Sequence, residues 1–193
     1  MELSKNEKSN LVRESKELYQ HAAKEMGKPV PDTQACLYYA CALQLLAAKQ
    51  HGIRLMMQAG SAQWPMTLPE DDDGISATHY GYIWEGLQHP AVQAQIRKKE
   101  LPELHVWLAH RKPDTIIDPT TSTWKKRAEA DGFVWTGPKP PRYLWLSMNE
   151  FFDLMQEKYP LGIVYQPDLE ATKLSNYYAE LEIYPTMINI IRS

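Results

Sequence analysis

The stretch from Ala35 to Gln50 constrains the fold more than any other part of the chain, because it is apolar on nearly every side of a helix. A helix that is hydrophobic all round lies inside a protein rather than on its surface. Asp32 is a good cap for such a helix, with Thr33 opening it, and Gly52 is a good residue to end it. The sequence therefore predicts a buried central helix between Thr33 and Gly52.

The rest of the chain shows shorter helical and strand patterns without an internal repeat. We expect residues 61–77 to form a long surface loop and residues 120–141 to form a loop with one short element. Helices are predicted over 10–26, 90–100, 151–159 and 169–180, and strands over 53–59, 78–86, 103–110, 114–121, 142–147, 161–167 and, from strand propensity, 181–191. This order predicts an α+β protein in which the buried helix packs on a mainly antiparallel sheet.

A length of 193 residues fits one domain, and no segment looks like a linker between two. We expect a single domain over residues 1–193. Residues 1–30 would form an N-terminal helical segment of that domain, and residues 121–193 would form a C-terminal extension of it. With 44% hydrophobic residues, the chain can bury a sizeable core without metal or disulfide support.

Charge and composition exclude several classes of function. The net charge is −3, so the basic excess typical of a nucleic-acid-binding protein is missing. No apolar run approaches the roughly 18 residues that span a bilayer. The first ten residues are polar, and there are only two cysteines. These features predict a soluble, cytoplasmic protein in a reducing compartment that binds neither nucleic acid nor membrane, and they leave its oligomeric state open.

Cys36 falls about one turn inside the predicted central helix. A helix N-terminus stabilises a thiolate, the reactive form of cysteine, through its unpaired N–H groups and its dipole. Cys41 lies five residues further on and diverges around the helix, so we expect no disulfide and treat Cys41 as a small core residue. The alternative for Cys36 is the same inert, buried thiol.

A hairpin formed by 103–110 and 114–121 would bring a histidine and a carboxylate together. With a four-residue loop, paired residue numbers sum to 223, and His105 falls directly opposite Asp118. Such a carboxylate can hold an imidazole in one tautomer. Trp107 shares the face of His105, and the apolar residues between them point to the other face. Taken singly, His105 could equally be a satisfied core histidine, and Asp118 a turn residue ending its strand.

In order and spacing, these residues resemble the transglutaminase-like superfamily, which has a papain-related Cys-His-Asp fold. The resemblance covers about residues 32–120. Gln34 and the residues directly flanking the cysteine differ from the Gly or acidic neighbour common in that family, and the long gap before the histidine implies an inserted loop. The matching residues are Cys36 at the start of a buried helix, Gly52-Ile53 at its end, Gly60 closing the next strand, His105-Val106-Trp107 and Asp118-Pro119-Thr120.

The resemblance implies acyl transfer through a Cys-His-Asp triad. Cys36 would attack an amide or ester carbonyl, His105 would move the proton, and Asp118 would orient His105. The backbone N–H of Cys36 would donate to the oxyanion. The remaining oxyanion or substrate-binding contacts stay open among Gln34, Gln58, Trp64 and Trp107. Water as acceptor gives a protease or amidase, and an amine gives an acyltransferase; the substrate would be a peptide, a protein or a small acyl compound.

Two further readings stay open. The same fold could lack activity and serve as a protein- or peptide-binding module, or the chain could be an unrelated α+β protein with chance matches.

The aromatic residues of 78–86 could line a substrate groove, although a core role is simpler. The basic run 125–127 is typical of a solvated turn rather than a phosphate site. The histidines lack zinc-ligand spacing, so we expect no metal, and the implied chemistry needs no cofactor.

Overall fold

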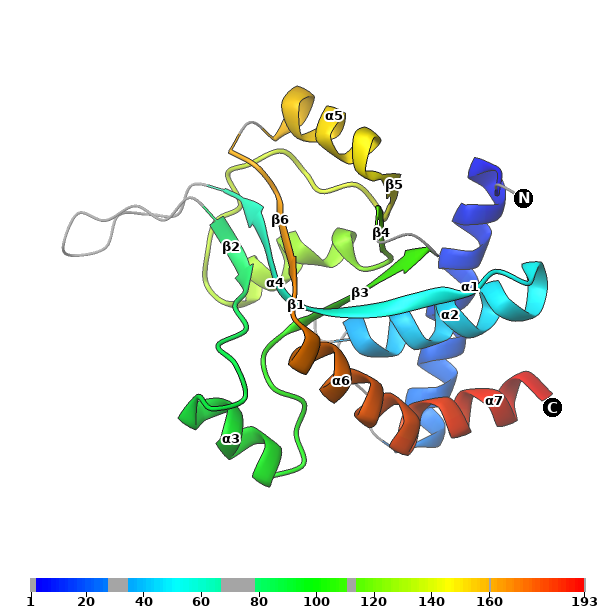
Figure 1. The fold of residues 1–193 in the computed structure, drawn as a ribbon. Coiled ribbons are helices and arrows are strands. Elements are labelled where there is room, and N and C mark those ends of the chain that lie inside the picture. Colours follow the sequence, from blue (N-terminus) through cyan, green and yellow to red (C-terminus); the bar gives the residue numbers. More distant parts are fainter. Residues whose placement is uncertain (1–2, 28–34, 67–78, 111–113, 160, 193) are drawn as a thin grey trace.

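The computed structural model describes residues 3–27, 35–66, 79–110, 114–159 and 161–192. These residues form a mixed α+β structure with a curled, six-stranded antiparallel sheet (Figure 1). The strands are β1 (Leu55–Pro65), β2 (His79–Tyr82), β3 (His105–His110), β4 (Thr115–Asp118), β5 (Leu144–Ser147) and β6 (Val164–Pro167). The helices are α1 (Lys5–Glu25), α2 (Cys36–His51), α3 (Pro90–Arg97), α4 (Trp124–Ala130), α5 (Met148–Lys158), α6 (Leu169–Tyr178) and α7 (Tyr184–Arg192), with a 3-10 turn at Thr121–Thr123 and a π-helical turn at Ala179–Ile183.

Strand β1 organises the sheet, because three other strands pair with it. Gly60 pairs with His105 of β3 on one edge and with Pro167 of β6 on the other. Gln63 pairs with β2 and β6 in the same two-sided way. Strands β3 and β2 therefore occupy successive parts of one edge of β1, and β6 occupies the opposite edge. From β3 the sheet continues through β4 to β5.

Helix α2 is the buried central helix that the sequence predicts. It runs alongside β1 and β3 and is covered by α1 and α7 (Figure 1). Gly52 ends it in the left-handed conformation (φ 65°), which glycine adopts without steric cost. Its first residue is Cys36, and Thr33, the predicted first residue, lies outside the described residues. The proposed cap Asp32 lies outside the described residues, and Ala35 at the cap position offers no side-chain hydrogen bond.

The two faces of the sheet carry two separate cores. Val106 and Leu108 point toward α2 and join the core formed with α1, α6 and α7. Trp107, between them, points to the other face and joins a second core that is rich in aromatic residues. That second core also contains Trp124 of α4, Phe151 of α5 and Ile163, which directly precedes β6. The alternation expected for the strand 103–110 therefore places its tryptophan and its aliphatic residues as predicted.

Two predictions of secondary structure were wrong. Residues 61–65 continue β1 instead of starting a surface loop, because Ala62 and Trp64 are fully buried between β2 and β6. The rest of that predicted loop, 67–77, lies outside the described residues. The C-terminal segment is helical, not a strand, because Ile183 and Met187 recur at helical spacing and are both buried in the core beside α1 and α2.

The other element boundaries shift by a few residues. Helix α1 starts at Lys5, earlier than predicted, since Ser4 and Glu7 form a capping box. Strand β2 is shorter than the predicted 78–86. Among the described helices, none combines the length and the apolar character needed to cross a membrane.

Candidate active site

His105 and Asp118 form a buried pair. The Nε2 atom of His105 lies 2.8 Å from Oδ2 of Asp118, and the two residues are 1% and 0% exposed. His105 opens β3, and Asp118 closes β4. The pair therefore lies at one end of the two strands, where the chain runs on into Pro119 and the helical turn that precedes α4.

The register of the hairpin differs from the prediction by two residues. Leu108 pairs with Ile117, so paired numbers sum to 225 instead of 223, and His105 does not face Asp118 directly. Because the shift is an even number, both side chains stay on the same face of the sheet. The imidazole reaches the carboxylate diagonally, as diagonal neighbours on one face can.

Asp118 accepts four hydrogen bonds. Its Oδ1 accepts from the backbone N–H of Thr120 at 2.8 Å and from the hydroxyl of Thr120 at 2.6 Å. Its Oδ2 accepts from His105 and from the hydroxyl of Tyr165 on β6 at 2.6 Å. Burial alone would raise the pKa of Asp118, but the His105 charge and these donors outweigh burial and lower it. Asp118 is therefore an ionised acceptor, which requires Nε2 of His105 to carry a proton.

His105 is enclosed by aromatic rings. Tyr82 stacks on the imidazole with ring centres 5.1 Å apart, Trp124 meets it edge-on at 5.0 Å, and Trp107 lies at 6.1 Å. Burial would lower the pKa of His105, but the charge and hydrogen bond of Asp118, helped by Cys36, raise it to about 9. Its second nitrogen, Nδ1, is buried and has no hydrogen-bond partner among the described residues. Asp118 therefore holds one nitrogen of the imidazole, Nε2, and the other nitrogen, Nδ1, is available.

Cys36 lies in the same cavity as His105, whose Nδ1 atom is available to accept a proton. Cys36 and His105 line the same narrow cavity together with Tyr82, Trp124 and Arg127. As the first residue of α2, Cys36 sits among the N–H groups that have no partner within the helix. A wider cavity of about 600 Å³ also borders Cys36. Both cysteines are buried, Cys36 at 5% exposed and Cys41 at 0%, and burial raises the pKa of the Cys41 thiol far above its usual range.

Arg127 is a member of this site that the sequence did not indicate. Residues 125–127 were expected to be a solvated turn, but they belong to α4, and the Arg127 side chain is only 16% exposed. Its guanidinium lies 3.5 Å from the centre of the Tyr82 ring and pairs with Glu103 at 2.6 Å. Its Nη1 atom is buried without a hydrogen-bond partner among the described residues. Arg127 lines both cavities that contain Cys36.

Tyr82 and Tyr165 also belong to the site, and little in the sequence indicates either of them. The aromatic pattern around Tyr82 fits a groove lining or, more simply, a core strand, so it does not identify Tyr82 as a neighbour of His105. Tyr165 lies 47 residues from Asp118 in the chain, and only the pairing of β6 with β1 brings it close. No local motif marks such a contact.

The suggested oxyanion and substrate residues lie in different places. Gln58 and Trp107 pair across β1 and β3, and the indole N–H of Trp107 donates to Oε1 of Gln58 at 2.9 Å. Trp64 is fully buried in the aromatic core, edge-on to Tyr159. None of these three residues is among those that line the two cavities containing Cys36. Gln34 lies outside the described residues.

Within the described ranges, no cluster of three or more His, Cys, Asp or Glu side chains is placed to hold a metal ion. His105 uses one nitrogen for Asp118, and His79 directs its Nε2 to the backbone carbonyls of Leu161 and Gly162.

Comparison with known proteins places the fold but not the activity. No protein-family model matches the chain, and no curated protein matches its sequence. A solved structure described as the crystal structure of genomics APC5867 is similar, with a TM-score of 0.52 and 10% sequence identity. The match covers 93% of this chain and 76% of that one. At this identity the likeness concerns the fold alone, and it supports a mixed α+β domain.

Proposed function

We propose that the chain is a cysteine enzyme of transglutaminase-like type, which cleaves or transfers acyl groups through Cys36, His105 and Asp118. The observation that carries this proposal is the different surroundings of the two ring nitrogens of His105. Its Nε2 is fixed by an ionised, buried carboxylate, while its Nδ1 is unpartnered and shares a cavity with a cysteine at a helix N-terminus. Most buried side-chain polar atoms in proteins have a hydrogen-bond partner, so an unpartnered imidazole nitrogen beside a thiol supports a chemical role for His105.

The first half of the reaction forms an acyl-enzyme. Nδ1 of His105 takes the proton of the Cys36 thiol, and the sulfur attacks the carbonyl carbon of an amide or ester. The carbonyl π electrons move onto oxygen, which lies near the N–H groups at the start of α2. When the tetrahedral intermediate collapses, the C–N or C–O bond breaks, and His105 gives its Nδ1 proton to the leaving group.

The second half releases the acyl group. Water or an amine attacks the thioester carbon, and Nδ1 of His105 takes the proton of the attacking group. The C–S bond then breaks, and the sulfur leaves as a thiolate beside the imidazolium. A pKa of about 9 keeps His105 protonated at neutral pH, so the leaving sulfur meets a positive charge.

Two residues are candidates for the second oxyanion donor. Arg127 lines the Cys36 cavity with its unpartnered Nη1 and brings a positive charge, which would stabilise a developing oxyanion in a dry site. Gln34, two residues before Cys36 in the sequence, is the second candidate, and it lies outside the described residues.

Alkylation kinetics test the proposal directly. The rates of iodoacetamide labelling at Cys36 and Cys41 are read by mass spectrometry between about pH 5 and 9, so that Cys41 serves as an internal control. His105→Ala is compared with His21→Ala, which changes an exposed histidine of α1. His105→Gln is run alongside as a variant of closer size, and near-UV circular dichroism reports whether each variant is folded.

We expect fast labelling of Cys36 below pH 8, slow labelling of Cys41, and a loss of the fast rate in folded His105 variants but not in His21→Ala. Active protein should also release product from a panel of acyl esters and glutamine peptides, and Cys36→Ser should not. Equally slow labelling of both thiols in the wild-type protein would refute an activated Cys-His pair. It would favour the alternative, a catalytically inactive fold that binds a protein or peptide.

A further inference from the structure

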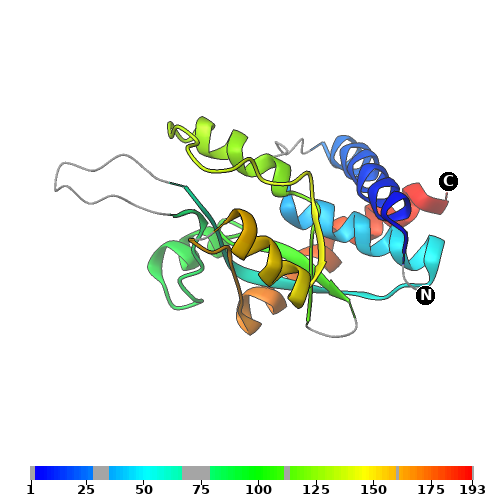
Figure 2. The same cartoon turned by 90° about the horizontal axis from the view of Figure 1, so that it is seen from above.

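A cavity with lysine and arginine as half of its lining residues lies beside the candidate active site. Its volume is about 480 Å³, within the usual range for small-molecule sites. Its charged side chains come from α1, from α4 and from the segment that leads into β5, and Figure 2 shows α1 (blue) and α4 (yellow-green) on the same side of β1. The charged residues that line it are Arg13, Lys16, Lys125, Lys126, Lys139, Arg142 and Glu129.

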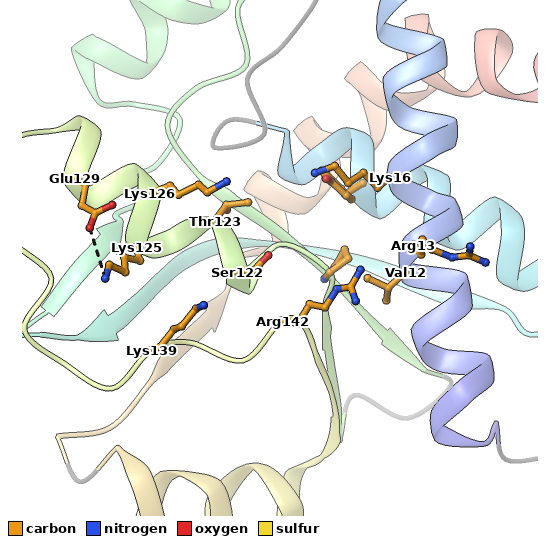
Figure 3. Close-up of a pocket in the computed structure, with 12 residues that line it drawn as sticks. Val12, Arg13, Lys16, Ser122, Thr123, Lys125, Lys126, Glu129, Lys139 and Arg142 are labelled. Carbon is orange, nitrogen blue, oxygen red and sulfur yellow. Dashed lines mark ion pairs between the residues drawn. The ribbon is translucent and has the colours of Figure 1, made fainter.

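The cations are directed into a common space (Figure 3). Lys126 on α4 and Lys16 on α1 point toward one another, and Lys139 and Arg142 point into the same region from the opposite wall. Arg13 points away from it. Four cationic side chains from three separate parts of the chain therefore converge.

Little negative charge balances this cluster. Of the described residues that line the cavity, Glu129 alone is acidic, and its carboxylate already pairs with Lys125 at 3.7 Å. Lys126, Lys139 and Arg142 have no ion-pair partner within the part of the chain that the structure describes. The whole chain carries a net charge of −3, so the cluster is a local feature and not the result of a basic protein. Like charges held together repel, and a bound anion would relieve that repulsion.

The rest of the lining suits a small molecule. Val12, Tyr39 and Pro119 supply an apolar part, and Ser122 and Thr123 supply hydroxyl groups next to the cations. Thr123 also lines the narrow cavity that contains Cys36 and His105. An occupant of the basic cavity would therefore lie next to the candidate catalytic centre.

We propose that this cavity binds the di- or triphosphate group of a small molecule, with Lys126, Lys139 and Arg142 as its main phosphate contacts. Lysine and arginine bind phosphate through charge-assisted hydrogen bonds, and a group with several charges matches cations that converge from several sides. This assignment replaces the reading of the basic run in α4 as a plain solvated turn: Lys125 and Lys126 face the basic cavity, and Arg127 faces Cys36.

A nucleic acid fits the same cations less well. A polymer of regularly spaced phosphates is bound along a basic stripe or face and favours an excess of positive charge over the domain. Here the cations gather in one cavity of a chain that is acidic overall. A compact polyanion is the better match.

Calorimetric titration with inorganic phosphate, pyrophosphate and tripolyphosphate at low ionic strength tests the proposal. The titrations use the wild-type chain and Cys36→Ser, so that binding is measured independently of any acyl transfer. The double variant Lys139→Gln, Arg142→Gln is compared with Lys98→Gln, Lys173→Gln. Both double variants lose two positive charges, and the second pair lies outside the cavity: Lys98 is exposed just after the end of α3, and Lys173 is exposed on α6.

We expect affinity to rise from phosphate to tripolyphosphate, to fall about tenfold or more in the cavity variant, and to change less than about twofold in its control. Thermal melting without ligand verifies that both variants are folded. If wild-type protein shows no binding of tripolyphosphate at millimolar concentration, or if both double variants lose affinity equally, no such site exists. Tighter binding of a short single-stranded RNA than of tripolyphosphate would also overturn the proposal and assign the cations to nucleic acid.

Discussion

Asp118→Asn replaces one oxygen of a fully buried carboxylate with an amide group of nearly the same size. The Oδ1 side can still accept from Thr120, but an NH₂ group then faces His105 and Tyr165. The tyrosine hydroxyl can turn and accept. The imidazole can accept only by giving up its Nε2 proton, which leaves the neutral ring with its proton on Nδ1, facing Cys36. That tautomer cannot take a proton from the thiol.

The size of the effect follows from the pKa of His105. In the wild-type protein it is raised to about 9 from an ordinary value of 6.5. Without the carboxylate, burial is the main remaining influence, and it lowers the pKa of His105. At pH 7 the imidazolium is then lost, and linkage gives a decrease in the free energy of unfolding of roughly 2–3 kcal/mol. The rate of Cys36 alkylation at the same pH should fall about tenfold or more.

The pH dependence gives a second check. Since folding raises the pKa of His105, its stabilising contribution is fully present below pH 6.5 and disappears as the pH rises through about 9. The stability difference between wild type and Asp118→Asn should shrink over that interval. Urea unfolding followed by tryptophan fluorescence measures it, with Asp153→Asn on the exposed side of α5 as the matched control. A difference below about 0.5 kcal/mol at pH 7, or one that does not change with pH, would refute the ion-pair argument.

Two other substitutions test how the site is held in place. Gly60→Ala puts a Cβ atom 2.2 Å from the backbone oxygen of Gln166, so β6 must move off β1 and urea unfolding should show a loss of about 1–3 kcal/mol; wild-type stability would contradict the strand pairing. Tyr165→Phe removes one donor to the Asp118 carboxylate and should lower the free energy of unfolding by about 1.5–3 kcal/mol, whereas Tyr177→Phe on the exposed face of α6 should have no effect. Equal losses from the two tyrosine variants would show that the contact with Asp118 contributes nothing.

Local sequence patterns predicted the parts of the structure that local interactions determine. The apolar run after Ala35 predicted the buried helix, and Gly52 predicted where that helix ends. The shared face of His105 and Trp107 also followed from strand alternation alone. The exact register did not, because it depends on a turn of uncertain length, and an error of two residues leaves every side chain on the correct face.

The errors arose where distant segments decide the outcome. The end of β1 looked like a loop because the partners that bury Ala62 and Trp64 are β2 and β6, and β6 is about a hundred residues further along the chain. The C-terminal segment has strand propensity, but packing against α1 and α2 selects the helix that buries Ile183 and Met187 together. The pairing of β6 with β1 also brings Tyr165 to Asp118, and no sequence motif indicates that contact.

The position of β6 also sets the order in which the molecule is completed during synthesis. Cys36, His105 and Asp118 all leave the ribosome well before Tyr165, whose hydroxyl completes the shell around the carboxylate. Until then one edge of β1 has no strand to pair with, and contacts this far apart in sequence form slowly. A nascent chain thus carries Cys36, His105 and Asp118 before the strand that completes the hydrogen bonding of the carboxylate, so the buried His105–Asp118 pair gains its last donor only after β6 has been synthesised.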